Sequence, residues 1–373
     1  MRIEFTLHDE PGSDAGGMGV TSGLTRVYRE LGHEVGLLCF ADLPSGLPFM
    51  AKTIAFPGLV AARLRRADLD VVDAATGDGW ILGLLRRRQT HKRPLLVCRS
   101  HGMSYLADKA NREEERRGNL ELSWKYPLYW GGLRPRQDSA AMRSADLCLY
   151  LNEQEREVAI NELGIQPEKA RIVDNGLPAE LLGRELEPLP PLSEQLRIAH
   201  IGSYLPHKGT RHLAAALTLV LEQHPQAAAT LLGTGADPGS VLADFPPALH
   251  ERVTVIPSYP RTDLPALLAG HAVAASASIR EGFPLGTIEA MACGLVPVVT
   301  DIPGPTQYVR DEANGLLIPV ADGAAMAAAV NRLVAEAELF ERLRQAAHAT
   351  AQRYSWERVA RETLGLYEEA MGR

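Results

Sequence analysis

The sequence predicts an α/β fold with mostly parallel sheets, divided between two domains. Short apolar segments alternate with amphipathic segments along most of the chain, a pattern typical of strands joined by helices in a parallel sheet. The 373 residues exceed what one ordinary hydrophobic core holds. A strand, a glycine-containing loop, a helix and a second strand also occur near the start of each half. We therefore expect two similar Rossmann-like domains.

The first domain begins with an alternating apolar strand at residues 2–7, followed by a polar loop at residues 8–19. Gly32 then ends a helix whose apolar face consists of Val20, Leu24, Val27 and Leu31. Further apolar strands are expected at residues 34–40, 70–75, 94–100 and 145–151. This half of the chain therefore predicts one parallel sheet covered by helices.

A domain boundary is expected near the middle of the chain. The turn signal Asn175–Gly176 is followed by a proline-rich segment at residues 184–196. We therefore predict a first domain over residues 1–183, a linker over 184–196 and a second domain over 197–353.

The second domain repeats the alternation of strand, loop and helix. Residues 196–202 predict a strand and residues 203–209 a loop, and the next strand is expected at 229–235. Between them lies a helix that Pro225 ends, with an apolar face formed by Leu213, Ala216, Leu217 and Val220. The run AVAASAS at residues 272–278 predicts a buried strand.

Composition excludes several classes of protein. The net charge of -7 argues against a general nucleic-acid binder, whose binding domain is normally basic. The four cysteines lie far apart without metal-ligand spacing, which indicates reduced thiols in a cytoplasmic protein. No apolar run approaches the roughly 20 residues of a membrane span. We expect a cytoplasmic protein, and peripheral contact with the inner face of the membrane stays open.

The segment EGFPLG at residues 281–286 is the most informative loop. It follows the predicted buried strand, and its two glycines permit a backbone that presents a row of N–H groups to an anion. The next helix is expected from Thr287 to Gly294, which places Glu289 in the first turn, where a helix dipole alone explains an acid. The dipole leaves Glu281 unexplained. A strand, a glycine loop and a helix in this order indicate a phosphate and sugar site.

Four other segments lie at the ends of predicted strands, and three of them have an ordinary alternative. GGMG at residues 16–19 suits a ligand-binding loop or merely a tight turn. Lys208 in GSYLPHKG could meet a phosphate or stay solvated, and LLGTG at 231–235 is a further glycine turn. His101 follows the strand at 94–100, where it is either a site residue or a packed histidine.

Together these motifs resemble family 4 of the retaining glycosyltransferases. The resemblance runs through GGMG, LGHEV, SHG at residues 100–102, NG at 175, GSYLPHKG, LLGTG and NGLLIP at 314–319. Its most specific part is the glutamate pair with the continuation AMACGLVPVV. The family implies the GT-B fold, in which two Rossmann-like domains with parallel sheets face each other across a cleft. It also implies that a helix at residues 354–373 completes the first domain.

The resemblance assigns roles residue by residue. Lys208 contacts the donor diphosphate, Glu289 holds the ribose hydroxyls, and Glu281 and His101 lie by the transferred sugar. The implied catalytic residues are His101, Glu281 and Lys208. The implied donor-binding residues are Gly17, Gly202, Ser203, Lys208, Gly233, Glu281, Gly282, Phe283, Pro284, Leu285, Gly286, Thr287 and Glu289. Ser203 departs from the family, which usually has arginine there.

The implied reaction transfers a hexosyl-type sugar with retention from a UDP- or GDP-sugar to a glycan, lipid-linked or small-molecule acceptor. It passes through an oxocarbenium-like state while a diphosphate leaves, so fixed positive charge at the leaving group accelerates it. The acidic triplet at residues 68–70 lies at a helix-to-strand junction, outside any expected metal position. We expect no cofactor and no metal, with Lys208 and helix dipoles stabilising the leaving group.

Two alternatives remain beside the transferase. One is a nucleotide-sugar-binding protein without turnover, which Ser203 makes conceivable, and the other is a sugar-nucleotide epimerase of the same architecture. A dehydrogenase is disfavoured because neither glycine loop has the dinucleotide fingerprint.

The acceptor region is less defined. The charge run at residues 112–117 indicates a solvated helix. The aromatic cluster that follows suits the core, an acceptor wall or a membrane-facing edge: Trp124, Tyr126, Tyr129 and Trp130.

Overall fold

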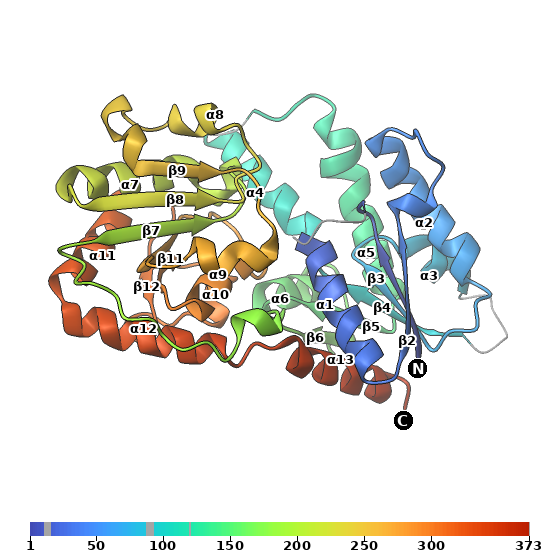
Figure 1. Ribbon diagram of the computed structural model, residues 1–373. Coiled ribbons are helices and arrows are strands. Elements are labelled where there is room, and N and C mark those ends of the chain that lie inside the picture. The colour runs from blue at the N-terminus through green and yellow to red at the C-terminus, as the bar shows by residue number, and fades with distance from the viewer. Residues whose placement is uncertain (11–15, 87–92, 119–120, 373) are drawn as a thin grey trace. The chain divides into compact units, whose positions relative to one another are not determined.

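A computed structural model describes residues 1–10, 16–86, 93–118 and 121–372 (Figure 1). Contacts divide the chain into two units. The first contains Met1–Gly176 together with Trp356–Arg373, and the second contains Leu177–Ser355.

The first unit contains a six-stranded parallel sheet in the order β2-β1-β3-β4-β5-β6. Its strands are β1 (Arg2–Leu7), β2 (Glu34–Cys39), β3 (Val71–Ala75), β4 (Leu95–Arg99), β5 (Leu147–Tyr150) and β6 (Ala170–Ile172). The first five are the predicted strands. Ile3 pairs with Val35 on one side and Val71 on the other, so the apolar runs form the centre of the sheet.

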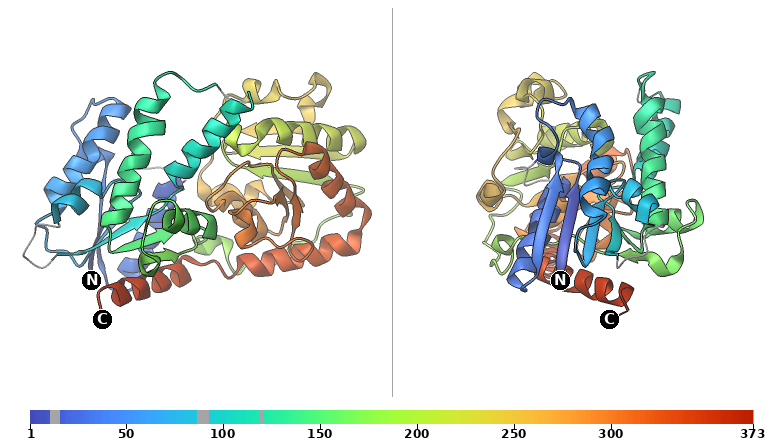
Figure 2. Two further views of the ribbon diagram at one scale, coloured as in Figure 1. Left: turned by 180° about the vertical axis from the view of Figure 1, so that it is seen from behind. Right: turned by 90° about the vertical axis from the view of Figure 1, so that its right-hand side faces the viewer.

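Helices cover both faces of this sheet (Figure 2). They are α1 (Gly16–Glu30), α2 (Phe49–Leu64), α3 (Trp80–Arg86), α4 (Ser104–Arg116), α5 (Arg134–Ser144), α6 (Glu153–Asn161) and α13 (Trp356–Ala370). The short turns η2 (Tyr126–Leu128) and η3 (Tyr129–Leu133) lead into α5. The predicted apolar face of α1 is buried at Val20, Leu24 and Val27.

The C-terminal helix α13 packs in the first unit. Trp356, Val359 and Tyr367 are buried. Tyr367 accepts a hydrogen bond from Arg99 (3.3 Å) and donates one to Asp73, and Arg99 and Asp73 form a buried ion pair. Asp73 and Arg99 lie on β3 and β4, so this polar cluster connects the last helix of the chain to the centre of the sheet.

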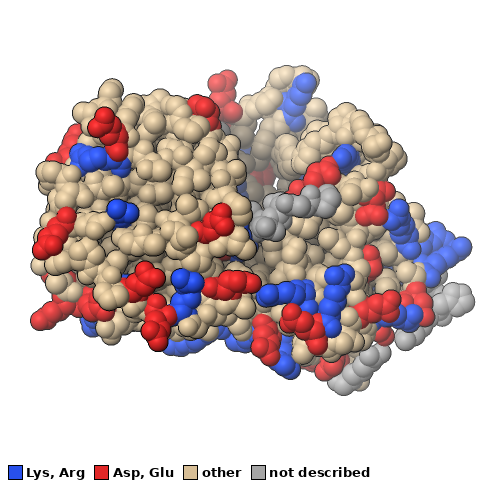
Figure 3. All heavy atoms as spheres, in the orientation of Figure 1, with Lys and Arg blue, Asp and Glu red and all other residues tan. Residues whose placement is uncertain are grey.

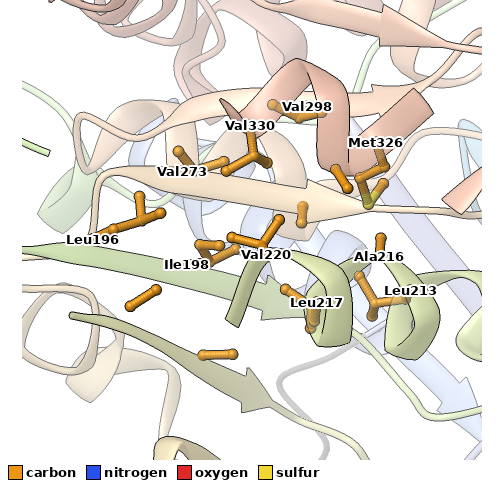
Figure 4. Packing of buried hydrophobic residues seen from close by; sticks show 14 of the residues in the cluster. Leu196, Ile198, Leu213, Ala216, Leu217, Val220, Val273, Val298, Met326 and Val330 are labelled. Atoms are coloured by element: carbon orange, nitrogen blue, oxygen red, sulfur yellow. The ribbon is translucent and has the colours of Figure 1, made fainter. Parts of the chain in front are cut away.

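The second unit contains another six-stranded parallel sheet, in the order β12-β11-β10-β7-β8-β9. Its strands are β7 (Leu196–Ile201), β8 (Ala227–Leu232), β9 (Val253–Ile256), β10 (Val273–Ser276), β11 (Val296–Thr300) and β12 (Leu316–Ile318). Its helices are α7 (Thr210–Gln223), α8 (Pro238–Leu242), α9 (Leu264–Leu267), α10 (Leu285–Ala292), α11 (Gly323–Ala335) and α12 (Ala337–Ala351). Figure 4 shows the packing of β7, β10 and β11 against α7 and α11 in the core.

The proline-rich segment at residues 184–196 lies within the second unit. Leu192 is buried in its core, Leu189 packs against that core, and Arg344 donates to the Glu187 carbonyl (2.6 Å). The unit boundary itself falls between Gly176 and Leu177, at the predicted NG turn. The prolines therefore shape the surface of the second unit.

Two helix starts differ from the sequence prediction. GGMG forms the first turn of α1 instead of a loop, and residues 11–15 of the predicted polar loop lie outside the described residues. Helix α10 begins at Leu285, directly after Pro284, so Glu289 lies in its second turn and not its first. Proline suits the start of a helix because the first N–H groups have no acceptor within the helix.

Charged side chains of both signs intermingle on the face drawn in Figure 3. Within the described residues, no helix is both long and apolar enough to cross a bilayer. All four cysteines are free thiols, and three of them are buried.

Candidate active site

Loops of the second unit gather at the carboxyl edge of its sheet. β7, β8 and β10 are parallel neighbours, or neighbours of neighbours, so the segments that follow Ile201, Leu232 and Ser276 emerge on the same side. These segments contain most of the residues that the sequence assigned to the donor. The edge beyond the carboxyl ends of parallel strands is where ligands bind in α/β sheets.

An ion pair joins Lys208 and Glu281 at this edge. Lys208 Nζ lies 2.6 Å from Glu281 Oε1, and the Ser278 hydroxyl donates to the same oxygen at 2.7 Å. The two loops are also tied by their backbones, because Ile279 N–H donates to the His207 carbonyl (2.9 Å). The structure thus brings two predicted catalytic residues into direct contact.

Glycines allow these loops to approach one another. A Cβ on Gly209, whose φ is +65°, would lie 1.9 Å from the carbonyl oxygen of Ala277. A Cβ on Gly286 would lie 2.6 Å from the carbonyl oxygen of Ile201. Contacts this short exclude any side chain, so the first turn of α10 rests directly on the end of β7.

Aromatic packing holds the EGFPLG loop in place. Phe283 is buried, with its ring 5.2 Å from that of Tyr308 and 5.9 Å from that of Tyr354. Tyr308 donates to the carbonyl of Pro284 (2.7 Å) and Gln307 to that of Gly282 (3.3 Å). The side chain of Phe283 therefore shapes the loop, and only its backbone is available to a ligand.

Glu289 is buried and forms an ion pair with Arg261. Burial raises the pKa of Glu289, and Arg261 opposes that rise. Burial, with a contribution from Glu289, also raises the pKa of Tyr259 to about 12. The helix dipole does not explain a buried carboxylate that is paired with an arginine.

Arg261 was missed by the sequence analysis. It follows β9, at the same carboxyl edge as the other loops. The signal that could have found it is a polar side chain soon after a strand, but the sequence analysis did not predict the strand at Val253–Ile256. Arg280, directly before Glu281, is a second missed cation, and it helps to lower the pKa of His207.

Two histidines lie beside Lys208. Burial, followed by the charges of Lys208 and Arg280, lowers the pKa of His207 to about 4. His200 is buried in β7, and burial with a smaller effect of Lys208 lowers its pKa to about 4. His200 Nδ1 lies 2.9 Å from the Ala275 carbonyl, so Nδ1 carries the proton. Both imidazoles are neutral at pH 7.

The remaining donor-loop residues follow β7 and β8. Gly202 N–H donates to the Leu232 carbonyl (2.9 Å) and Gly233 N–H to the Ile256 carbonyl (2.8 Å). Ser203 is half-buried and next to Gly202. Thr287 is buried in the first turn of α10, and its N–H donates to the Pro284 carbonyl (3.2 Å).

Gly17 and His101 lie together in the first unit. A Cβ on Gly17 would be 3.4 Å from His101 Cγ, so the first turn of α1 approaches the imidazole closely. Burial and the nearby charge of Arg99 lower the pKa of His101 to about 4, and it is neutral at pH 7. The structure thus places these two predicted residues side by side, at the carboxyl edge of the first sheet.

A buried polar network at this edge was also missed. His8 Nδ1 lies 2.8 Å from Asp78 Oδ1, and Arg134 Nη2 lies 3.0 Å from His8 Nε2. Arg134 Nε is 3.3 Å from Asp138 Oδ1, and Asp138 accepts from the Ser104 hydroxyl. His8 directly follows the first strand, so the rule that selected His101 would have selected it too.

No three His, Cys, Asp or Glu side chains come close enough to hold a metal ion in the part of the chain that the structure describes. The candidate site contains charged and polar side chains, glycine loops and the N-terminus of α10.

Two family models match the chain, one to each half. Residues 16–181 match the model described as "Glycosyltransferase Family 4", and residues 195–336 match "Glycosyl transferases group 1". This chain belongs to the family 4 glycosyltransferases. The predicted family and the predicted GT-B type of fold are both confirmed.

Curated relatives of this family 4 member are similar over part of their length. D-inositol 3-phosphate glycosyltransferase of Salinispora tropica is 30% identical over 184 residues, which cover 47% of this chain and 38% of that protein. A UDP-Gal:alpha-D-GlcNAc-diphosphoundecaprenol alpha-1,3-galactosyltransferase of Escherichia coli is 23% identical over 268 residues, 69% of this chain and 65% of that protein. The chain thus spans less than two thirds of either relative.

Solved structures share the fold of this family 4 member over its full length. Sucrose-phosphate synthase from Thermosynechococcus elongatus has a TM-score of 0.79 at 19% identity, with 100% of this chain and 99% of that chain covered. Anabaena Alr3699/HepE in complex with UDP and glucose has a TM-score of 0.69 at 19% identity, with 99% and 100% covered.

Proposed function

We propose that this chain transfers a sugar from a nucleoside diphosphate sugar to an acceptor, with retention and without a metal. The observation that carries the proposal is the Lys208–Glu281 ion pair beside the glycine loop that begins α10. It presents a cation, a carboxylate and the N-terminus of a helix at one edge of the sheet. The cation and the helix N-terminus suit a diphosphate, and the carboxylate suits the positive charge that develops on its sugar.

Lys208 is the proposed partner of the leaving diphosphate. In this structure its ammonium group is bound to Glu281, and an arriving phosphate competes with that carboxylate for it. As the bond to the sugar breaks, negative charge grows on the diphosphate, and Lys208 with the N–H groups at the start of α10 offsets that charge. Glu281 then remains beside the positively charged sugar ring.

Glu289 is the proposed partner of the ribose. Its carboxylate is held in place by Arg261, and it accepts hydrogen bonds from hydroxyl groups. His101 is proposed to contact the sugar from the first unit, as a neutral imidazole. Because Gly17 has no side chain, the start of α1 lies close to the imidazole of His101.

The proposed donor is a UDP- or GDP-sugar, and the proposed acceptor is a lipid-linked glycan or a small molecule. Curated relatives support this range, because their names include a UDP-Gal galactosyltransferase and a GDP-mannose mannosyltransferase, both acting on polyprenol-linked diphosphates. Others are named for inositol 3-phosphate. The free thiols fit the cytoplasmic location that we propose.

A panel of nucleotide sugars tests the proposal. Thermal unfolding identifies the donor, since a ligand at 100 times its Kd adds about 2.7 kcal/mol to the free energy of unfolding. Product analysis with and without acceptor, repeated with a chelator, follows for the best donor. We expect transfer or slow hydrolysis with an unchanged anomeric configuration, and no effect of the chelator.

Other outcomes identify other functions. Stabilisation by a nucleotide sugar without any turnover would indicate the binding protein. Conversion of the donor sugar without an acceptor would indicate the epimerase. Inversion of the anomeric centre would refute retention, and activity lost to the chelator and restored by a divalent metal would refute metal independence.

A further inference from the structure

Helix α2 exposes apolar side chains on its outer face. Its inner face buries Phe56, Val60 and Leu64, as expected of a helix that covers a sheet. Its first turns, however, also expose Phe49 (56%), together with Met50 and Ile54. A helix that is apolar on both faces is normally covered on both.

A second exposed apolar segment adjoins the first. Trp124 is 78% exposed, and Leu128, Trp130 and Leu133 are exposed beside it on η2 and η3. The ring of Trp130 stacks on that of Phe49, with centroids 6.5 Å apart. We call the combined surface the apolar patch, which consists of Phe49, Met50, Ile54, Trp124, Leu128, Trp130 and Leu133.

The apolar patch lies toward the carboxyl edge of the first sheet. Helix α2 starts after β2 ends, and η3 belongs to the connection that leaves β4. Leu133 directly precedes Arg134, which contacts His8 after β1 (3.0 Å). The patch is therefore on the side of this unit that carries Gly17 and His101.

The segments that form the apolar patch are basic in an acidic protein. Residues 49–66 and 122–136 contain no Asp or Glu, whereas the whole chain has a net charge of -7. Their basic residues are Lys52, Arg63, Arg65, Arg66, Lys125, Arg134 and Arg136. The structure places acids from neighbouring segments beside Lys52, Arg63 and Arg134. Lys125 Nζ lies 5.4 Å from the centre of the Trp124 ring, which keeps a cation on the exposed indole.

We propose that the apolar patch docks on the surface of an anionic lipid bilayer. Tryptophan and lysine or arginine together suit the boundary between head groups and acyl chains, where indoles insert and cations meet anionic lipids. A second copy of this chain suits the patch less well, because a two-fold interface would place the basic segments of one copy against those of the other.

The purpose of docking rests on the proposed function, to which it adds the class of acceptor. A bilayer at this edge presents a lipid-linked acceptor to the side of the first unit where His101 lies. The same patch has no use for a freely diffusing acceptor, so docking selects the lipid-linked class among the proposed acceptors.

Co-sedimentation with vesicles tests the docking without donor or acceptor. Vesicles of phosphatidylcholine alone are compared with vesicles that also contain phosphatidylglycerol. The variants are Trp124→Ala and Lys125→Glu, and their controls on exposed sites elsewhere are Leu219→Ala on α7 and Arg26→Glu on α1. All four side chains are on the surface, so folding is expected to survive.

We expect wild type to bind the anionic vesicles more tightly than the neutral ones, and more weakly as salt rises. Lys125→Glu and Trp124→Ala should each weaken that binding by roughly fivefold or more, with the controls unchanged. No binding by wild type, equal binding by both patch variants, or loss of self-association in the patch variants without vesicles would overturn the inference. Failure here leaves donor binding untouched, and failure of donor binding leaves vesicle binding measurable, so the two proposals fail separately.

Discussion

At the scale of single residues, Glu289 is a buried charge whose burial costs free energy. Its carboxylate is buried against Arg261, in the second turn of α10. Keeping an ionised acid there costs free energy that the arginine offsets. A residue kept at such cost is a candidate for recognition.

We predict that Glu289→Gln weakens the binding of the nucleotide-sugar donor by about tenfold or more. A hydrogen bond to a charged group is worth roughly 1.5 to 3 kcal/mol, and the amide also leaves Arg261 without its charge partner. Glu357→Gln, at an exposed ion pair with Arg361, is the control and should bind as wild type does. Calorimetric titration measures both, and unchanged affinity in Glu289→Gln would remove the ribose role.

His101 is predicted to act on turnover more than on affinity. Its proposed partner is the sugar in the reacting geometry, so His101→Ala should lower kcat while the Kd of the nucleoside diphosphate stays within about threefold. Steady-state kinetics and titration with the diphosphate separate the two quantities. An equal loss in both would make His101 a packing residue beside Gly17.

At the scale of elements, the contact between α10 and β7 positions the donor loop. The missing side chain at Gly286 allows that contact, since a Cβ there would meet the Ile201 carbonyl and side chain. The loop therefore depends on the helix lying where it does.

We predict that Gly286→Ala lowers both donor affinity and the unfolding temperature. The methyl group forces α10 away from β7 and moves the EGFPLG backbone that we propose faces the donor. Gly365→Ala in α13 is the matched control, because a Cβ there meets nothing within 4 Å and alanine favours a helix by about 0.5–1 kcal/mol. Thermal unfolding and titration of both variants test this, and a Gly286→Ala protein as stable as wild type would contradict it.

Eight of the twelve described strands were predicted, whereas β6, β9, β11 and β12 were not, and neither were the long-range side-chain pairs. Val71–Ala75 and Val273–Ser276 are apolar except for Asp73 and Ser276, so burial on both faces of a parallel sheet is visible in the local sequence. The start of α10 was placed two residues late because Gly286 reads locally as a loop residue, whereas its role is a close contact with a distant strand. Arg261 and Glu289 are 28 residues apart, and no local pattern reveals that they meet.

At the scale of the whole molecule, three histidines are held neutral by the fold. The pKa values of His101, His200 and His207 are all lowered to about 4, by burial first and then by nearby cations. In an unfolded chain a histidine has a pKa near 6.5. The folded protein thus binds fewer protons than the unfolded chain between these values.

Stability is therefore predicted to fall as the pH drops from about 6.5 toward 4. A lowered histidine pKa contributes stability that is complete above the unfolded value and lost as the pH falls toward the folded one. Denaturant unfolding at several pH values should show this slope, and His200→Gln should make it shallower even if the variant is less stable overall. An identical slope in His200→Gln would show that His200 does not contribute.

The central claim is that the carboxyl edge of the second sheet binds the donor diphosphate through Lys208. Titration of UDP and GDP into wild type, Lys208→Ala and the control Lys109→Ala tests it most directly, since Lys109 forms an ion pair with Glu162 on the surface of the first unit. We predict that wild type binds at least one of the two, that Lys208→Ala binds it about tenfold more weakly or worse, and that Lys109→Ala is unchanged. Equal affinity in wild type and a folded Lys208→Ala protein would contradict the claim.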